Sequence, residues 1–169
     1  MGSEVDVQDG QDEAAFRRTR QLEELRLDIS EVDTYAREVD AEFGGSWLVS
    51  DADPIRLVLA VTTDPAPHRA AVAGRLEHPD RLDVVQVRYP HAELREIQRA
   101  VDADATGVAA FAAVAIDAPT NAVVVTLGAA NEVYADELRL RFGDRVRVEV
   151  ELTDSPAARP EERRDAPGR

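Results

Sequence analysis

The chain has 169 residues, of which 44% are hydrophobic and 32% charged, a composition typical of a globular protein. Its formal net charge is −14, because 34 Asp and Glu outnumber 20 Lys and Arg. Such an acidic surface repels phosphate backbones and anionic membranes, which argues against nucleic acids and membranes as partners.

The sequence contains no cysteine, which excludes disulfides and thiolate metal sites. Its first ten residues, MGSEVDVQDG, have neither the basic nor the apolar segment of a signal peptide. No run approaches the roughly 20 apolar residues that span a bilayer. We therefore expect a cytoplasmic protein, or a secreted one if an upstream signal peptide has been omitted.

The N-terminal part is expected to be helical after a disordered start. Residues 1–12 are acidic and lack hydrophobic periodicity, whereas residues 13–27 carry the spaced apolar positions of a weakly amphipathic helix. Ser30 is a candidate N-cap for a second helix. That helix is predicted to end at Gly44-Gly45, since glycine commonly follows a helix C-terminus.

A first group of strands follows. The continuous apolar run 57–61 predicts a strand covered on both faces. Asp64 is placed to cap the next helix, with Pro65 at its first position. Strands are predicted at 46–50, 56–63 and 82–89, and helices at 65–76 and from Pro90, where Leu94, Ile97 and Val101 share a face.

After a linker expected at 102–109 the same order returns. Strands are predicted at 113–116 and 122–127, followed by a helix that Asn131 caps and Gly143 ends. Residues 145–151 alternate strictly, with valines on one side and charges on the other, as in a half-exposed strand at a sheet edge. Residues 153–169 are rich in Pro, Ala and charge and are predicted to be a disordered tail.

The two groups can be superposed along the sequence. Laying Asp51-Ala52 over Asp117-Ala118 also places Val58 over Val124, so we expect an internal repeat. The predicted fold class is α+β, with two β-β-α-β units and additional N-terminal helices. The expected divisions are a disordered N-terminus (1–12), the helices with a first β-β-α-β-α lobe (13–103), a second β-β-α-β lobe (104–152) and the tail (153–169).

Catalytic chemistry has little support in the sequence. Asp64 and His68 are four residues apart near a helix start, a spacing that fits a metal pair or equally a capping Asp beside a solvent-facing His. Ser46 follows two glycines without the GxSxG elbow of a hydrolase. His78 and His91 flank prolines without a telling carboxylate, and no Gly-rich phosphate loop occurs. We predict no enzyme activity, no catalytic residues, no cofactor and no metal.

Two features point to binding instead. Trp47, the only tryptophan, is either an interface anchor or, as we favour, a core residue. An exposed sheet edge can recruit a partner strand, although edge charges can also guard against such pairing. The candidate partner-binding edge consists of Arg145, Val146, Arg147, Val148, Glu149, Val150 and Glu151.

The motifs Phe43-Gly44-Gly45-Ser46-Trp47, Val87-Arg88-Tyr89 and Asp117-Ala118-Pro119-Thr120-Asn121-Ala122-Val123-Val124-Val125 resemble those of a known family. They are similar to motifs in the pro-regions of α-lytic-protease and streptogrisin-type serine proteases, where the first and the last form hairpins. Actinobacterial proteins of unassigned function share the pattern. The resemblance covers about residues 35–151. It implies a folding chaperone and inhibitor whose C-terminal lobe pairs a sheet with the protease, here through strands 123–127 and 145–151.

Three functions remain open at this point. The first is a non-enzymatic module that binds a protein partner, or a second copy of itself, through a sheet edge. The alternative is a relative of protease pro-regions that works in trans as a folding aid or inhibitor, since no protease domain follows in the sequence. The third is a hydrolase with a site around Asp64 and His68, which requires both side chains to line one pocket.

Overall fold

The computed structural model describes residues 4–105, 108, 111–128 and 130–150, with side chains from residue 13 onward. None of the helices in these ranges is long and apolar enough to cross a membrane. The main elements are α1 (Glu4–Glu24), α2 (Arg26–Glu38), β1 (Phe43–Val49), β2 (Arg56–Val61), α3 (Pro65–Ala73), β3 (Leu82–Gln86), α4 (His91–Asp104), β4 (Phe111–Asp117), β5 (Ala122–Leu127), α5 (Glu132–Phe142) and β6 (Val146–Val150).

The strands form two three-stranded sheets, ordered β1-β2-β3 and β4-β5-β6. In each sheet the first two strands are antiparallel and the third is parallel to the second, joined by a helix. A parallel neighbour needs such a crossover, which α3 and α5 supply. The predicted α+β fold with two β-β-α-β units and N-terminal helices is therefore confirmed.

The N-terminal lobe is built around β2. Every residue from Leu57 to Val61 is buried, so the prediction that both faces of this strand are covered is confirmed. Leu57, Leu59 and Val61 pack with Val32 and Tyr35 of α2 and Val72 of α3 in one hydrophobic cluster. Asp64 caps α3, since its carboxylate accepts a hydrogen bond from the Ala66 N–H at 3.0 Å.

The C-terminal lobe has its own hydrophobic cluster, in which Leu94, Ile97 and Val101 of α4 pack against Val123, Val125 and Leu127 of β5. The helix α4 thus packs with the second sheet, whereas the sequence assigned it to the first lobe. It also continues through Asp104, into the stretch predicted as a linker. Its amphipathic face was read correctly, but the sheet that the face covers lies later in the sequence.

The N-terminal helices differ from the prediction. α1 begins at Glu4, inside the segment 1–12 that was expected to be disordered. Ser30 lies within α2 and does not cap it, because Leu25 and Ile29 extend the apolar face before it. Phe43 and the two following glycines belong to β1, not to a helix end, since Phe43 pairs with Val61 of β2. The proposed tail, residues 153–169, lies outside the described residues.

A compact joint connects the lobes at Tyr89 and Asn121. The Asn121 side chain accepts a hydrogen bond from the Tyr89 N–H at 2.7 Å and donates one to the Tyr89 carbonyl at 2.9 Å. Asn121 is buried and has φ of 51°, a left-handed conformation that Asn tolerates better than most residues. The Tyr89 hydroxyl donates to Asp144, which lowers the pKa of that carboxyl.

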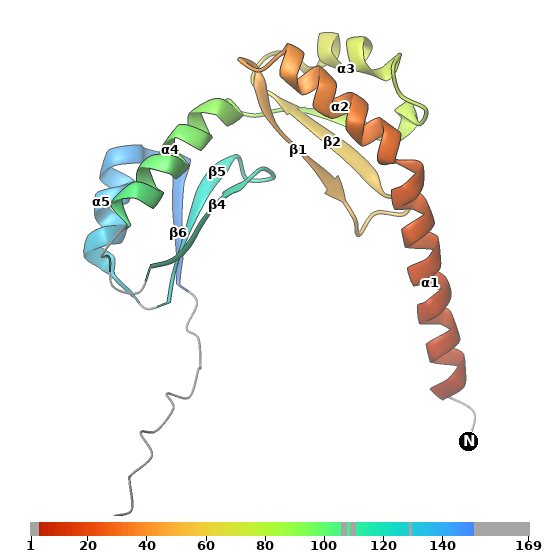
Figure 1. The fold of residues 1–169 in the computed structure, drawn as a ribbon, viewed down its shortest axis with the longest axis horizontal. Helices are drawn as coiled ribbons and strands as arrows, with labels where there is room; N and C mark the ends of the chain where they lie inside the picture. The colour runs from red at the N-terminus through yellow and green to blue at the C-terminus, as the bar shows by residue number, and fades with distance from the viewer. Residues whose placement is uncertain (1–3, 106–107, 109–110, 129, 151–169) are drawn as a thin grey trace, which may run out of the picture.

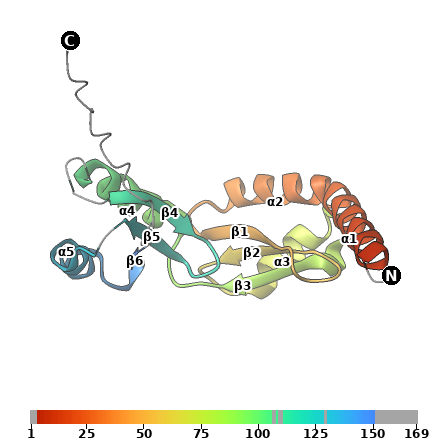
Figure 2. The ribbon, with the colours of Figure 1, turned by 90° about the horizontal axis from the view of Figure 1, so that it is seen from below.

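The two lobes form an arch (Figure 1). α2 and α3 cover the outer face of the first sheet, and α4 and α5 cover that of the second, so both sheets line the inner side. Seen from below, the β4–β5 hairpin reaches toward β1 and β3 (Figure 2). The inner faces of the sheets are therefore the surfaces that a partner inside the arch would meet.

Gly45 lies where the lobes touch, and its replacement by alanine should destabilise the fold. Its φ of +135° is strained for any L side chain, and an added Cβ would stand 3.0 Å from the Ala118 Cβ. We expect Gly45→Ala to lower the free energy of unfolding by about 2 kcal/mol, measured by urea denaturation.

Gly74→Ala is the matched control, because nothing lies within 4 Å of its added Cβ and its φ of −70° suits alanine. Its stability should change by less than about 1 kcal/mol. The double variant Gly45→Ala, Ala118→Gly should recover only part of the loss, since the backbone strain remains. Equal stability of Gly45→Ala and the native chain would refute this account of the joint.

Candidate functional site

The candidate partner-binding strand lies at a sheet edge. β6 pairs only with β5 among the described residues, in the parallel register that joins Val123 to Val146 and Leu127 to Val150. A strand in this position presents a row of backbone N–H and C=O groups on its outer side. Arg145 immediately precedes β6, and Glu151 lies outside the described residues.

The side chains of β6 alternate as the sequence predicts. Val146 is buried and Val148 packs at the border of the same cluster, under the helices. Arg147 and Glu149 are exposed on the opposite face, toward the inside of the arch. Val150 ends the strand with 45% of its surface exposed. The strand thus combines one anchored face with a free edge.

The charges near β6 are mostly paired with one another. Arg147 forms ion pairs with Asp117 of β4 at 3.4 Å and with Glu149 at 2.9 Å, and Arg145 pairs with Glu93 of α4. All these side chains are about one third or more exposed, so each pair contributes at most about 1 kcal/mol. Because Asp117 lies two strands away, Arg147 reaches across the sheet face and not outward from the edge.

The inner face of the second sheet carries small side chains. Ala113 and Ala115 of β4 are exposed, and Val124 and Thr126 of β5 are half-buried. These four side chains are short, whereas Arg147 and Glu149 of β6 stand on the same face and Arg147 reaches across it to Asp117. A strand added at β6 would extend this face next to Arg147 and Glu149.

Asp64 and His68 do not share a site, although the sequence left that possibility open. The Asp64 carboxylate caps α3, while the buried His68 ring lies 2.8 Å from the Tyr35 hydroxyl and 2.9 Å from Thr63 Oγ1. The Glu42 carboxylate lies 3.3 Å from His68 Nε2, the ring nitrogen that also contacts Thr63. Tyr35 and Glu42 were missed because they precede His68 by a strand or more, with no local spacing to link them.

This cluster has a hydroxyl beside an imidazole, the pair that nucleophilic catalysis requires. However, the Thr63 hydroxyl donates to Glu42, and both ring nitrogens of His68 are engaged. The bonds tie α3 to α2 and to the turn before β1. In the described part of the chain, no group of three or more His, Asp or Glu is arranged to hold a metal ion.

The contacts of the other residues singled out from the sequence are explained by the fold. The His78 ring contacts Asp28, and the His91 ring packs edge-on against Phe43. Ser46 and Trp47 lie in β1, and both are half-buried. The expectation that Trp47 is a core residue is therefore only partly met, because it lies on the inner face of the first sheet, opposite the helices.

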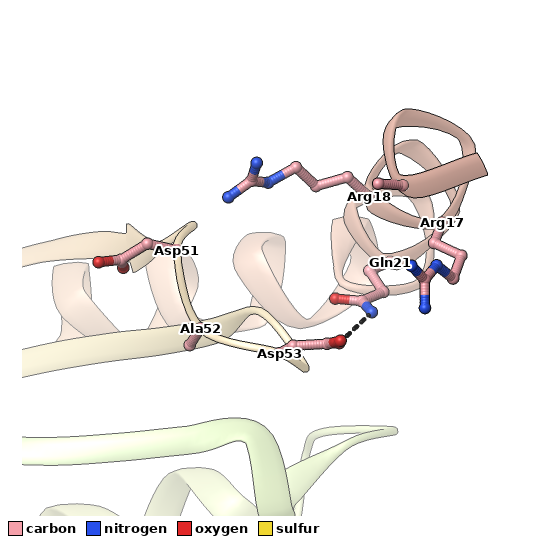
Figure 3. A pocket seen from close by; sticks show the side chains of 7 residues that line it. Arg17, Arg18, Gln21, Asp51, Ala52 and Asp53 are labelled. Carbon is pink, nitrogen blue, oxygen red and sulfur yellow. Dashed lines mark hydrogen bonds between the residues drawn. The ribbon is translucent and has the colours of Figure 1, made fainter. Parts of the chain in front are cut away.

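A shallow hollow between α1 and the β1–β2 turn is shown in Figure 3, lined by Ala14, Arg17, Arg18, Gln21, Asp51, Ala52 and Asp53. Gln21 donates to the Asp53 carboxylate at 3.0 Å and accepts from the Ile55 N–H at 2.8 Å. Arg18 donates to the Ser50 carbonyl at 2.9 Å. These hydrogen bonds hold α1 against the β1–β2 turn. The polar side chains of the hollow therefore have a structural role that requires no ligand.

One comparison with known proteins is informative. The family model of the alpha-lytic protease prodomain matches residues 89–139. The chain resembles protease pro-regions. Curated protein sequences yield no significant match.

The matched stretch covers most of the C-terminal lobe but stops within α5, before β6. It begins at Tyr89 in the joint and runs through α4, β4 and β5 into α5. It includes the hairpin from Asp117 to Val125, one of the three motifs that carry the sequence resemblance, whereas the motif at residues 43–47 lies outside it. Asn121 lies in that hairpin and binds the backbone of Tyr89, so it fixes the segment that connects β3 to α4.

Proposed function

We propose that this chain is a pro-region-type module that binds a serine protease through its C-terminal lobe, as a folding aid or inhibitor and not as an enzyme. The observation that carries the proposal is the prodomain match over residues 89–139, in the lobe whose strand β6 has a free edge. A sheet-edge module of unspecified partner was the broader expectation. The family match supports a protease as that partner.

The binding mode that fits is addition of a partner strand to β6. Main-chain hydrogen bonds would supply affinity, and the partner's side chains would lie beside Arg147 and Glu149 on the inner face. Val146 and Val148 anchor β6 in the hydrophobic cluster, which keeps the edge in place before a partner arrives. Preorganisation of this kind reduces the entropy lost on binding.

The proposed partner bears on location. A secreted protease can be met only in the compartment where it folds or acts. The cytoplasmic location expected from the sequence stays a prediction, and binding to a secreted protease would favour the secreted alternative.

The direct test uses a streptogrisin-type protease as the probe. We expect the chain to inhibit the native protease and to raise the activity recovered when the denatured protease is diluted from denaturant. Heat-denatured chain serves as the negative control in both assays. A chain that neither inhibits the protease nor changes the recovered activity would overturn the proposal.

Proline substitutions at Glu149 and Val150 test the edge itself. Successive backbone N–H groups of a strand point to opposite sides, so one of these prolines removes a bond to β5 and the other removes an outward N–H. The outward variant should keep native stability yet bind the protease at least about 10-fold more weakly, a loss of about 1.4 kcal/mol. Inhibition constants and thermal unfolding distinguish the two.

Glu149→Ala is the matched control, because it removes the side chain and keeps the backbone donor. It should bind within about threefold of the native chain, as expected for a rim charge. If the proline variant that retains its stability binds as well as the native chain, strand addition at β6 is wrong. Gel filtration of the chain alone reports whether the edge pairs with a second copy instead.

A further inference from the structure

His91 lies at the contact between the two lobes. It is the first residue of α4, which packs in the C-terminal lobe. Its ring lies against Phe43 of β1, in the other lobe, with ring centroids 5.5 Å apart and an angle of 61° between the planes. The ring therefore forms part of the contact that joins the two lobes.

The environment of the ring suits only the neutral form of imidazole. Nδ1 is buried and has no hydrogen-bond partner among the described residues. In the neutral ring Nδ1 can be the nitrogen without a proton, whereas the protonated ring carries an N–H on both nitrogens. Protonation would thus create a buried, charged donor without an acceptor, at the positive end of a helix.

Charges around His91 act in both directions. Arg95, one turn later on α4, repels a protonated ring, and Asp40, in the turn between α2 and β1, attracts it. Burial is the largest influence, followed by Arg95, and together they lower the pKa of His91 below its ordinary value of 6.5. The balance of all three keeps the ring neutral at pH 7.

The backbone that follows Phe43 is closely packed. An added Cβ at Gly44 would collide with the Val87 side chain, and one at Gly45 would nearly touch Ala118. A protonated ring can regain solvent by moving away from Phe43, and this movement separates α4 from β1. The response available to the joint is therefore to loosen.

We propose that His91 is an acid-sensitive clasp: its neutral ring holds the two lobes together, and its protonation loosens the arch. The sign follows from the lowered pKa. Above about pH 6.5 the ring is neutral in both the folded and the unfolded chain, and the full contact is present. As pH falls below 6.5 the unfolded or opened form binds the proton first, so the closed form loses stability until the ring of the closed form is protonated too.

The test measures the distance between the lobes in the chain alone, so its outcome is independent of any protease. Because the chain has no cysteine, spin labels can be placed uniquely at Ala71→Cys on α3 and Glu137→Cys on α5, both exposed. We expect the interspin distances from pulsed electron resonance to lengthen and broaden between pH 7.5 and pH 5.5. The imidazole NMR signals of His91 should titrate with a midpoint below 6.5.

Two variants distinguish the clasp from general acid effects. His91→Phe keeps an aromatic ring against Phe43 but cannot be protonated, so its distances should not change over this pH range. His91→Lys should show the longer distances already at pH 7.5. The proposal is overturned if the native distances are independent of pH, or if His91→Phe opens at pH 5.5 as the native chain does.

Discussion

Replacing Asp28 by alanine is expected to lower the free energy of unfolding by about 3 kcal/mol. Asp28 is only 1% exposed, and its carboxylate accepts hydrogen bonds from the Glu77 N–H at 2.8 Å and the His78 N–H at 3.1 Å. The His78 ring Nδ1 lies 3.1 Å from the same carboxylate. The substitution therefore removes the bonds that tie Glu77 and His78 to α2 and leaves two backbone donors unsatisfied.

Two further substitutions make this result specific. Asp28→Asn keeps one acceptor oxygen but places its NH2 group against a backbone N–H. It should therefore lower the free energy of unfolding by less than alanine does, about 1–2 kcal/mol. Asp33→Ala is the matched control, because Asp33 is an exposed carboxylate of the same helix and its loss should change stability by less than about 0.5 kcal/mol. Urea denaturation followed by the fluorescence of Trp47 reports directly on this lobe. Equal effects of Asp28→Ala and Asp33→Ala would contradict the account.

Asn121→Ala is the second change with a large expected effect, again about 3 kcal/mol. Two hydrogen bonds to the Tyr89 backbone account for about 1 kcal/mol each, and the left-handed φ of 51° adds about 1 kcal/mol of strain for alanine. Asn121→Gly removes the bonds without the strain, so it should lose about 2 kcal/mol. Equal stability of the alanine and glycine variants would show that the backbone conformation is not strained.

The same residue should decide whether the lobes unfold together. Trp47 lies in the first lobe and far-ultraviolet circular dichroism reports on both, so coincident curves indicate one transition. In Asn121→Ala we expect the two probes to separate, because the segment that connects the lobes loses its two hydrogen bonds to the β4–β5 turn. Curves that remain coincident in this variant would mean that other contacts, such as Phe43 with His91, suffice to couple the lobes.

Features that depend on neighbouring residues could be predicted from the sequence. The caps at Asp64 and Asn131 are present, because a side chain and the N–H groups it binds lie within three residues of each other. The alternation that identified β6 is equally local, and its edge position follows from its being the last strand of its unit. The edge position of β6 could therefore be predicted from the pattern alone.

Features that depend on distant residues were missed. Phe43 fits a helical spacing after Val39, yet it forms a strand because Val61 offers a backbone to pair with. The same limit applies to His68, whose partners Tyr35 and Glu42 come from elements folded over it. In both cases a weak local preference is overridden by contacts that exist only in the folded chain.

The sequence by itself determined the order of strands and helices, the caps at Asp64 and Asn131, the burial of β2 and the apolar faces of α4 and β6, because these arise from residues close to one another along the chain. Only the tertiary structure decided that α4 belongs with the second sheet and that Asn121 binds Tyr89 across the joint. It also placed the His91 ring between the lobes. The apolar face of an amphipathic helix does not specify which sheet the helix will cover. Burial of that face is favourable against any apolar surface that the chain brings near.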